Sequence, residues 1–404
     1  MQIIINMIFT KTTRIKTFFL APALFLVLGC NSQPVPAQNI TVGAEQTEKY
    51  LPLLEGKKVG LVGNQSSLVG TTHLLDTLIR CDISVAAIFC PEHGFRGQAE
   101  AGARINDGTD PQTGIPIISL FGANKKPQPK QLKGIDIVVF DIQDVGARFY
   151  TYISTLHYVM EACAENGVPL LVLDRPNPNG FYVDGPVLDT AYRSFVGMHP
   201  VPVVHGMTIG EYAQMINGEK WLKNGVQCQL SVIKVLNYTH DSLYHLPVAP
   251  SPNLQTDNAI LLYPSLCCFE GTTVSVGRGT PTPFEIIGSP TYSDKSFSFV
   301  PKPIKGVSNN PLHNGKTCYG IDLQKAGAEI VKNKQLNLGY LLTMYRKSDK
   351  NTFFLKNNFF DKLMGNSELR KQVKQGLTEK QIRQSWEPAL SEYKTMREKY
   401  LLYE

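Results

Sequence analysis

The sequence predicts an α/β protein built on a doubly wound parallel sheet, with a smaller α+β domain at the C-terminus. Three observations support this: short apolar runs of strand length, segments of helical periodicity between them, and polar motifs directly after the runs. Continuous apolar runs are typical of strands buried on both faces, as in parallel sheets. We expect strands at residues 57–62, 83–89, 135–140 and 169–173, and helices at residues 73–79 and 156–166.

Composition and hydrophobic periodicity change twice in the second half of the chain. Residues 195–300 are rich in Gly, Pro and Thr and weakly periodic, which predicts long site-forming loops. Beyond residue 303, helical patterns recur at 320–332, 337–347 and 379–399, and Thr378 with Gln381 fits a capping box. We therefore divide the folded part into a catalytic domain at 46–300 and an auxiliary α+β domain at 301–404.

Composition narrows the functional classes. The 404 residues are 43% hydrophobic and 18% charged, enough to bury a core without disulfides or metals. No stripe of Lys and Arg with interleaved aromatics is present, so we expect no nucleic-acid partner. Neither GxxxxGK[ST] nor a GxGxxG after the first strand occurs, so we expect no bound nucleotide. The cysteines and histidines are scattered, so we expect neither a disulfide framework nor a metal, and no cofactor.

The N-terminus has the pattern of an export signal. Basic residues precede an apolar run at 18–28, which is too short to span a bilayer, and the run ends in Val27-Leu28-Gly29-Cys30. This resembles a bacterial lipoprotein signal at 1–29, with Cys30 carrying the lipid and residues 30–45 forming a linker. We expect an exported, membrane-anchored protein that faces the periplasm. The alternative is an ordinary signal peptide that contains a cysteine.

Polar motifs after the predicted strands hold the candidate site residues. Glu92 follows the second strand, next to His93 and close to Arg96. A carboxyl group at a strand end can act as a general acid when burial raises its pKa, or as a base or nucleophile when it stays ionised. In the structural alternative, Glu92 lies at the start of a helix and its carboxylate accepts hydrogen bonds from backbone N–H groups. The spacing alone does not decide between the two roles.

The third strand is followed by a denser cluster. Its members are Asp141, Asp144, Arg148, Tyr150 and Tyr152. Carboxylates, a guanidinium and aromatic rings this close together suit a sugar or another polyhydroxylated ligand. For each residue taken singly, a structural role in the loop or the core is the more common outcome.

Two further loops complete the candidate site. Asn253 lies in a Ser-Pro-Asn turn, and Glu270 and Arg278 flank a Gly/Thr/Ser loop that suits an anion. The alternative for that loop is a tight turn whose charges are solvated.

Together, six motifs resemble those of the exo-β-N-acetylmuramidase family of peptidoglycan-recycling glycosidases. They lie at residues 90–94, 141–152, 173–178, 205–211, 251–253 and 275–280. The resemblance covers about residues 50–404. It implies a Rossmann-like catalytic domain with a smaller C-terminal domain closing a cleft. It also implies release of β-1,4-linked N-acetylmuramic acid (MurNAc) from the non-reducing end of peptidoglycan fragments such as MurNAc–GlcNAc.

The resemblance places the family's favoured catalytic carboxylate, the glutamate of Pro-Glu-His-Gly, at Glu92. For the second carboxylate that glycoside hydrolysis normally needs, we rank Glu270, then Asp144, then Asp141, or else the substrate's own acetamido group. The lactyl carboxylate of MurNAc calls for a guanidinium, for which Arg96, Arg148 and Arg278 are candidates.

The remaining candidates are contacts rather than catalysts. Tyr150 or Tyr152 is expected to stack on the sugar ring, and His93 and Asn253 are expected to contact or orient the substrate. Two other functions remain open. One is a muropeptide-binding lipoprotein without catalysis, and the other is an amidase or esterase using Cys90 as nucleophile.

Overall fold

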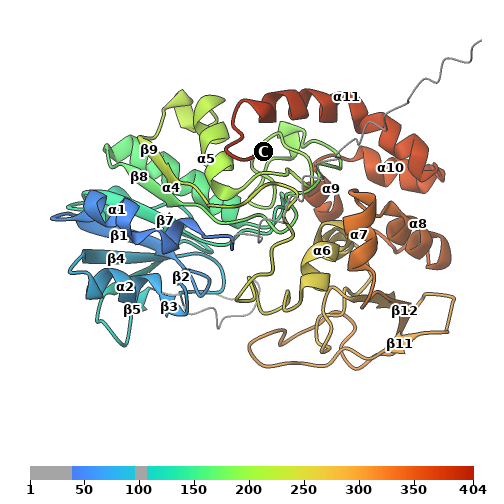
Figure 1. Ribbon diagram of the computed structural model, residues 1–404. Coiled ribbons are helices and arrows are strands. Elements are labelled where there is room, and N and C mark those ends of the chain that lie inside the picture. The colour runs from blue at the N-terminus through green and yellow to red at the C-terminus, as the bar shows by residue number, and fades with distance from the viewer. Residues whose placement is uncertain (1–38, 96–106) are drawn as a thin grey trace, which may run out of the picture. The chain divides into compact units, whose positions relative to one another are not determined.

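The computed structural model describes residues 39–95 and 107–404 (Figure 1). Its larger sheet has seven strands in the order β5-β6-β4-β1-β7-β8-β9, all parallel except β5. Their bounds are β1 Lys58–Gly63, β4 Ser84–Cys90, β5 Gly108–Thr109, β6 Pro116–Ser119, β7 Ile137–Asp141, β8 Leu170–Leu173 and β9 Leu230–Ile233. The four strands predicted from apolar runs are β1, β4, β7 and β8. Strands β6 and β9 were not predicted.

Helices cover both faces of this sheet (Figure 1). Helices α1 (Thr47–Leu54) and α2 (Leu74–Arg80) pack on one face, against side chains such as Leu61. Helices α4 (Tyr152–Asn166) and α5 (Ile209–Gly218) pack on the other, where the core includes the neighbouring Val62. Successive strand residues thus point into different hydrophobic cores, and the predicted doubly wound arrangement is confirmed.

Local signals in the sequence set several helix ends. Helix α4 ends before Gly167, whose φ of 66° lies in the left-handed region that glycine adopts readily. Helix α11 (Glu379–Glu398) begins with the predicted capping box. Its Thr378 hydroxyl accepts the Gln381 N–H at 3.4 Å, while the side-chain oxygen Oε1 of Gln381 accepts the Thr378 N–H at 3.0 Å. These ends follow from residues within one turn of the helix.

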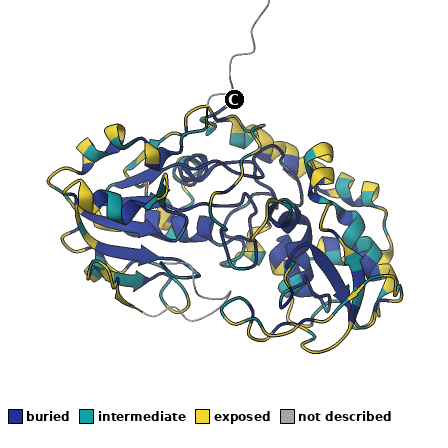
Figure 2. Ribbon diagram, turned by 60° about the horizontal axis from the view of Figure 1, so that its bottom comes forward, coloured by how far each residue is buried: buried dark blue, intermediate teal, exposed yellow. Residues whose placement is uncertain are grey.

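The C-terminal part contains a smaller antiparallel sheet with helices packed beside it (Figure 1). The sheet has the order β10-β12-β11, with β10 at Ile286–Ser289, β11 at Ser298–Phe299 and β12 at Cys318–Asp322. The helices are α6 Asp257–Leu266, α7 Gly327–Asn333, α8 Leu338–Lys347, α9 Phe359–Met364, α10 Glu368–Gln375 and α11. Figure 2 shows that the central strands of the large sheet are mostly buried while the outer helices expose one side.

One predicted helix is partly wrong. The segment 320–332 starts inside β12, and only α7 is helical within it. Gly320 pairs with Gly288 of β10, so closely that a Cβ on Gly320 would collide with the Ile287 carbonyl oxygen. Glycine therefore permits two backbones to approach here, a tertiary contact that helical periodicity does not report.

The first described residues pack onto the body, although we assigned them to the linker. The Thr41 N–H donates to the Leu236 carbonyl at 3.1 Å, and Val42 and Ala44 are buried. The Gly43 N–H donates to the Asp174 carbonyl at 2.8 Å. The Tyr403 hydroxyl, from near the other end of the chain, donates to the Asp174 carboxylate at 2.6 Å. Both ends of the described chain are thus fixed at the end of β8.

The remaining elements are short. They are α3 Pro129–Leu132, the hairpin of β2 Leu68–Val69 and β3 Thr72–His73, and 3₁₀ turns at Gly43–Glu45, Thr190–Tyr192, Lys223–Gly225 and Cys267–Gly271. No helix in the described ranges is both long and apolar enough to cross a membrane. Cys30, the predicted signal and Arg96 lie outside the described residues.

The sheet order determines where a ligand can bind. Strand β1 lies between β4 and β7, and the strands that follow each of these extend the sheet in opposite directions. In open parallel sheets, ligands bind beyond the carboxyl ends of the strands at such a switch point. The motifs after β4 and β7 lie there.

Candidate active site

A cavity of about 540 Å³ lies where the loops after β4 and β7 face the C-terminal part of the chain. It is lined by Glu92, His93, Phe149, Tyr150, Thr151, Tyr152, Val196, Ser251, Leu254, Tyr263, Cys267, Glu270, Arg278, Phe284, Val307, Ser308, Asn309, Asn310, Phe359 and Leu363. Its size and its mixture of aromatic, hydroxyl, amide and charged groups suit a small polar ligand such as a sugar.

A tight turn directly after β4 places Glu92 at this cavity. The Gly94 N–H donates to the Pro91 carbonyl at 3.1 Å, and His93 and Gly94 both have positive φ, 72° and 74°. A left-handed backbone is uncommon for a residue other than glycine and is often found at functional sites. The Thr151 hydroxyl, from the loop after β7, donates to Glu92 Oε2 at 3.3 Å. The loops after two strands that flank β1 therefore fix the position of this carboxylate.

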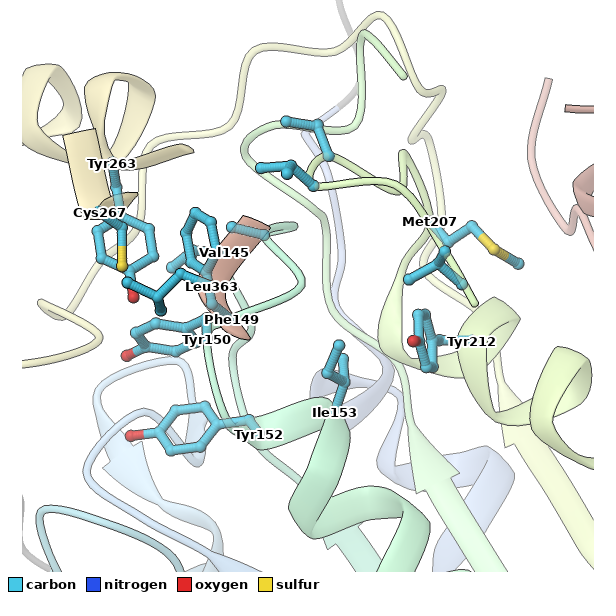
Figure 3. Packing of buried hydrophobic residues seen from close by; sticks show 14 of the residues in the cluster. Val145, Phe149, Tyr150, Tyr152, Ile153, Met207, Tyr212, Tyr263, Cys267 and Leu363 are labelled. Atoms are coloured by element: carbon cyan, nitrogen blue, oxygen red, sulfur yellow. The ribbon is translucent and has the colours of Figure 1, made fainter. Parts of the chain in front are cut away.

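Aromatic rings form one wall of the cavity, as Figure 3 shows for Tyr150, Tyr152 and Tyr263, whose hydroxyl groups lie at the left of the view. The Tyr150 ring meets the rings of Tyr152 and Tyr263 edge to face, with centroids 4.8 and 5.8 Å apart. The Tyr150 hydroxyl donates to the Pro250 carbonyl at 2.8 Å. Burial raises the pKa of all three phenols, which therefore stay neutral at ordinary pH.

Glu270 and Arg278, which also line the cavity, form an ion pair. Arg278 Nε donates to Glu270 Oε1 at 2.7 Å, and about a quarter of each side chain is exposed, 24% for Arg278 and 26% for Glu270. The Cys267 thiol contacts Glu270 Oε2 at 3.6 Å. The guanidinium carbon lies 5.2 Å from the centroid of the Phe284 ring. Burial disfavours the charge of Arg278, but the nearby Glu270 outweighs it and raises the pKa of the guanidinium.

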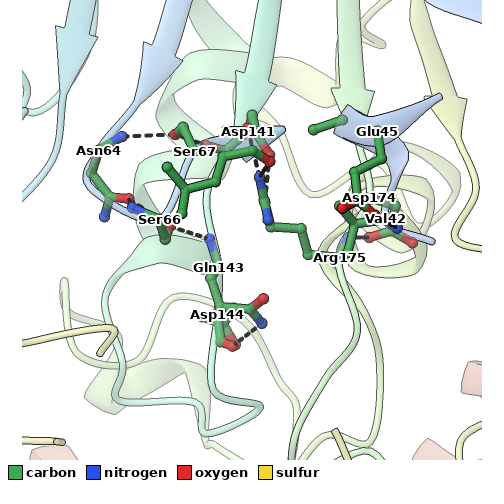
Figure 4. Close-up of polar contacts among 12 residues, drawn as sticks. Val42, Glu45, Asn64, Ser66, Ser67, Asp141, Gln143, Asp144, Asp174 and Arg175 are labelled. Atoms are coloured by element: carbon green, nitrogen blue, oxygen red, sulfur yellow. Dashed lines mark hydrogen bonds and ion pairs between the residues drawn. The ribbon is translucent and has the colours of Figure 1, made fainter. Parts of the chain in front are cut away.

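Asp141, predicted as a catalytic carboxylate, lies outside the cavity. Both of its oxygens accept hydrogen bonds from Arg175, at 2.5 Å from Nε and 2.9 Å from Nη2, and both side chains are buried (Figure 4). A carboxylate whose two oxygens are held by one buried guanidinium has a structural role. The structure therefore does not bring Asp141, which we had ranked as a candidate for the second catalytic carboxylate, to the cavity.

Asp144 also does not line the cavity. Its Oδ2 accepts the Gly146 N–H at 2.7 Å and lies 3.8 Å from His205 Nε2. Next to it, the Gln143 N–H donates to the Ser66 hydroxyl, which ties the loop after β7 to the loop after β1 (Figure 4). The structure thus places Asp144 in a buried loop network behind the aromatic wall, at 5% exposure, and not among the groups that face a ligand.

Arg148 is the clearest correction to the predicted ligand contacts. Its guanidinium is completely buried and donates to the carbonyl oxygens of Pro186, Val201 and Leu363, at 2.7 to 2.9 Å. Burial without a carboxylate partner lowers its pKa to about 9. The prediction failed because an arginine that fastens three segments of backbone looks the same in sequence as one that faces a ligand.

Asn253 acts on the cavity through a loop. Its side-chain amide donates to the Val307 carbonyl at 3.1 Å, and Val307 begins the wall formed by residues 307–310. Asn253 itself is 1% exposed and is not among the lining residues. It therefore holds one wall of the cavity in place, where we had predicted a direct contact with substrate.

Family models match almost the whole folded body. The N-terminal model of exo-β-N-acetylmuramidase NamZ matches residues 59–258, and the C-terminal model matches residues 261–403. The chain belongs to this family. The two models meet near residue 260. The domain boundary predicted from the sequence lies at residue 300, and it stays a prediction.

This member of the exo-β-N-acetylmuramidase family is similar to known proteins from two bacteria. Peptidoglycan β-N-acetylmuramidase NamZ of Bacillus subtilis (strain 168) is 39% identical over 371 residues, which are 88% of this chain and 89% of the relative. Two crystal structures of DUF1343 family proteins from Bacteroides fragilis NCTC 9343 also match. One has a TM-score of 0.85 at 44% identity, covering 91% of this chain and 99% of the other. The second has a TM-score of 0.74 at 28% identity, covering 90% and 99%.

Several residues that line this family member's cavity, or that bond to a lining residue, were not predicted from the sequence. Asn64, after β1, donates to the Tyr152 hydroxyl at 3.0 Å, and the rule that polar residues gather at strand ends would have found it. Asn309 and Asn310 lie in a loop that is brought to the site only by the tertiary fold. No group of three or more His, Cys, Asp or Glu side chains that could hold a metal ion occurs among the described residues.

Proposed function

We propose that this protein hydrolyses the β-1,4 bond of a MurNAc unit at the non-reducing end of peptidoglycan fragments, with Glu92 protonating the leaving oxygen. The observation that carries the proposal is the position of Glu92 in the cavity of a chain whose family consists of exo-β-N-acetylmuramidases. Protonation of the glycosidic oxygen by a carboxylic acid is the usual first requirement for cleaving such a bond.

The surroundings of Glu92 support this role. Among the described residues that line the cavity, only Glu92 and Glu270 carry carboxyl groups. Glu270 is already paired with Arg278, whereas the hydrogen bond from Thr151 to Glu92 fixes one oxygen by a neutral donor.

The aromatic wall supports a sugar as the ligand. Aromatic rings are common neighbours of a pyranose, and Tyr150 and Tyr152, which line the cavity, flank the Thr151 that donates to Glu92. Hydroxyl and amide groups at Ser251, Ser308 and Asn310 offer hydrogen bonds to sugar hydroxyls and to an acetamido group. The second role in hydrolysis then falls to Glu270 or to the acetamido group of the substrate.

The test is release of MurNAc from the MurNAc–GlcNAc disaccharide by the full chain and by its Glu92→Gln variant. Glutamine keeps the size of the side chain but cannot donate the acid proton, so turnover should fall roughly a hundredfold or more. Glu329→Gln, an exposed position on α7, is the matched control and should keep wild-type turnover. Turnover of Glu92→Gln within about tenfold of wild type would refute the assignment.

The two alternative functions make different predictions. A receptor without catalysis would bind the disaccharide and release no MurNAc, with either glutamate or glutamine at position 92. An amidase or esterase would need an activated thiol, but Cys90 is completely buried and burial raises the pKa of its thiol to about 12. Loss of activity after iodoacetamide treatment would support the thiol mechanism, whereas retained activity would exclude it.

We also propose that Cys30 carries a lipid that anchors the body to a membrane, with the body facing the periplasm. The support is the apolar run ending in Leu28-Gly29-Cys30, followed by a polar stretch that reaches the first described residues near Asn39. In cells, wild type should incorporate radiolabelled palmitate and partition with membranes, while Cys30→Ser should do neither. Labelling of the Cys30→Ser variant would rule out this site.

A further inference from the structure

We propose that Arg278 binds the lactyl carboxylate of MurNAc, and that Glu270 is a positioning residue that holds Arg278 for this contact. This inference rests on the proposed function, because it assumes that MurNAc occupies the cavity. It assigns to the Glu270–Arg278 pair the selection of MurNAc over GlcNAc, which has the same ring and acetamido group but no lactyl ether. It also removes Glu270 from the catalytic carboxylates that the sequence predicted.

The first argument is the charge of the cavity. Among its described lining residues, Arg278 is the only arginine or lysine, and it shares the cavity with the carboxyl groups of Glu92 and Glu270. An anionic ligand entering such a space needs a cation to offset the repulsion. Arg148, the other described candidate for this role, donates to three carbonyl oxygens and is fully buried.

The second argument is the geometry of the guanidinium. Within the described chain, the recorded hydrogen bond of Arg278 runs from Nε to Glu270 Oε1, so the two terminal nitrogens are left for a ligand. The Phe284 ring lies 5.2 Å from the guanidinium carbon and limits its rotation. A guanidinium fixed through Nε presents its terminal N–H groups as a fork, which matches the two oxygens of a carboxylate.

The third argument concerns Glu270. One of its oxygens is bound to Arg278 at 2.7 Å, and the other is contacted by the Cys267 thiol at 3.6 Å. A nucleophile or base must present an oxygen to the reacting centre, and each oxygen of Glu270 already has a hydrogen-bond partner in the protein. The pair also keeps Arg278 charged inside a partly buried site, since the guanidinium alone would pay for its desolvation. Glu270 thus acts on the ligand through Arg278.

The experiment compares free MurNAc and free GlcNAc as competitive inhibitors of the full chain. Wild type should bind MurNAc more tightly than GlcNAc. Arg278→Met should raise the inhibition constant of MurNAc roughly a hundredfold and that of GlcNAc less than about threefold, because only MurNAc loses a charge-assisted contact. Arg278→Lys should fall between, since it keeps the charge without the fork. Arg346→Met, an exposed arginine on α8, is the matched control and should change neither constant.

Two results would overturn the assignment of Arg278. One is unchanged MurNAc affinity in Arg278→Met. The other is an equal loss for both sugars, which would mean that the cavity as a whole had been disturbed. The thermal midpoint of each variant, together with the GlcNAc constant, reports whether the cavity is still formed.

Glu270→Gln tests the positioning role. Glutamine can still accept a hydrogen bond from Arg278 but holds it without charge, so KM for MurNAc–GlcNAc should rise roughly tenfold with kcat within about threefold of wild type. A nucleophile or base replaced by its amide would instead lower kcat by about a hundredfold or more at little cost in KM. That second result would return Glu270 to catalysis and overturn this part of the proposal.

The two proposals can fail separately. Binding of free sugars needs no turnover, so the Arg278 measurements can also be made in a Glu92→Gln background by direct titration. Suppose that Glu92→Gln keeps its turnover and that Arg278→Met loses affinity for MurNAc alone. The assignment of Glu92 then fails, and that of Arg278 stands. If wild type binds MurNAc no better than GlcNAc, the lactyl contact fails whatever Glu92 does.

Discussion

Two groups of charged residues lie at the carboxyl end of the large sheet, and they differ in what surrounds them. In the strand-end network, Asp141 and Arg175 are buried, and both oxygens of the carboxylate accept hydrogen bonds from the guanidinium. In the cavity, Glu92, Glu270 and Arg278 face an open volume, and the Glu270–Arg278 pair is about one quarter exposed. The network stabilises the loops, whereas the charged groups of the cavity remain accessible to a ligand.

This difference shows that a dense cluster of charged residues in the sequence does not by itself identify an active site. The motif 141–152 is the densest in the chain, yet Asp141, Asp144 and Arg148 all bond to protein groups. Only the end of that motif, at residues 149–152, reaches the cavity. Its acidic and basic members instead build the scaffold that holds the loops of several strands at fixed distances.

The largest expected effect is on the buried ion pair of the network. Asp141→Asn leaves Arg175 charged and buried without its counter-ion, so the free energy of unfolding should fall by about 3–5 kcal/mol. Asp241→Asn, which breaks the exposed pair with Lys334, is the matched control and should cost several times less. Urea unfolding of both variants measures the contrast. Equal losses would mean that burial does not distinguish the two pairs.

A smaller effect is expected from pH. His157 and His199 are buried and bond to each other at 2.9 Å beside Glu161, Arg193 and Lys126. Burial, more than any neighbouring charge, lowers the pKa of both imidazoles below the ordinary 6.5, so the folded state binds fewer protons than the unfolded state. Stability from this pair is therefore present above pH 6.5 and is lost as pH falls below it, by up to about 1.4 kcal/mol per pH unit for each imidazole.

The measurement is the difference in unfolding free energy between wild type and His157→Gln, at pH 7.5 and pH 5.5. The advantage of wild type should shrink toward pH 5.5, because only wild type has this imidazole to protonate. Taking a difference is necessary because burial raises the pKa of Asp174 to about 6, which gives the opposite slope, with stability gained as pH falls through that value. A difference that stays constant with pH would contradict the prediction.

The smallest expected effect is that of removing a hydroxyl group from the aromatic wall of the cavity. Tyr150→Phe keeps the ring that faces the cavity and removes only the hydroxyl that donates to the Pro250 carbonyl. That carbonyl also accepts from Tyr152 and Gln65, so the loss in stability should be about 1 kcal/mol or less. MurNAc release should stay within about twofold of wild type. A large loss of activity would show that the Tyr150 hydroxyl itself contacts substrate.

Much of the large sheet was predictable because its strands are apolar on both faces. The runs at 57–62, 83–89, 135–140 and 169–173 contain few polar residues, and each became a strand within two residues of its expected bounds. Strand β9 escaped because it lies at the sheet edge and is only partly buried, so it has no continuous apolar run. Periodicity reports burial, and elements that are half exposed give a weaker signal.

The candidate site was predictable only in part, for a different reason. The rule that ligands bind beyond the strand ends located the motifs of Glu92 and Tyr150, and both line the cavity. It could not tell which way Asp141 or Arg148 points, since that depends on partners such as Arg175 and on carbonyl groups far away in sequence. The wall at residues 307–310 was missed because it comes to the site through tertiary contacts alone.

The contact between Tyr403 and Asp174 has a consequence for the order in which the molecule is completed. Asp174 lies at the end of β8, near the middle of the chain, and the carboxylate accepts hydrogen bonds from Thr208, Gly210 and Tyr403. The first two donors follow soon after it in synthesis, but the last arrives only when residue 403 has been made. Until then this buried acid lacks one of its three donors from outside its own turn, so its hydrogen bonds are complete only when almost every residue of the chain has been made.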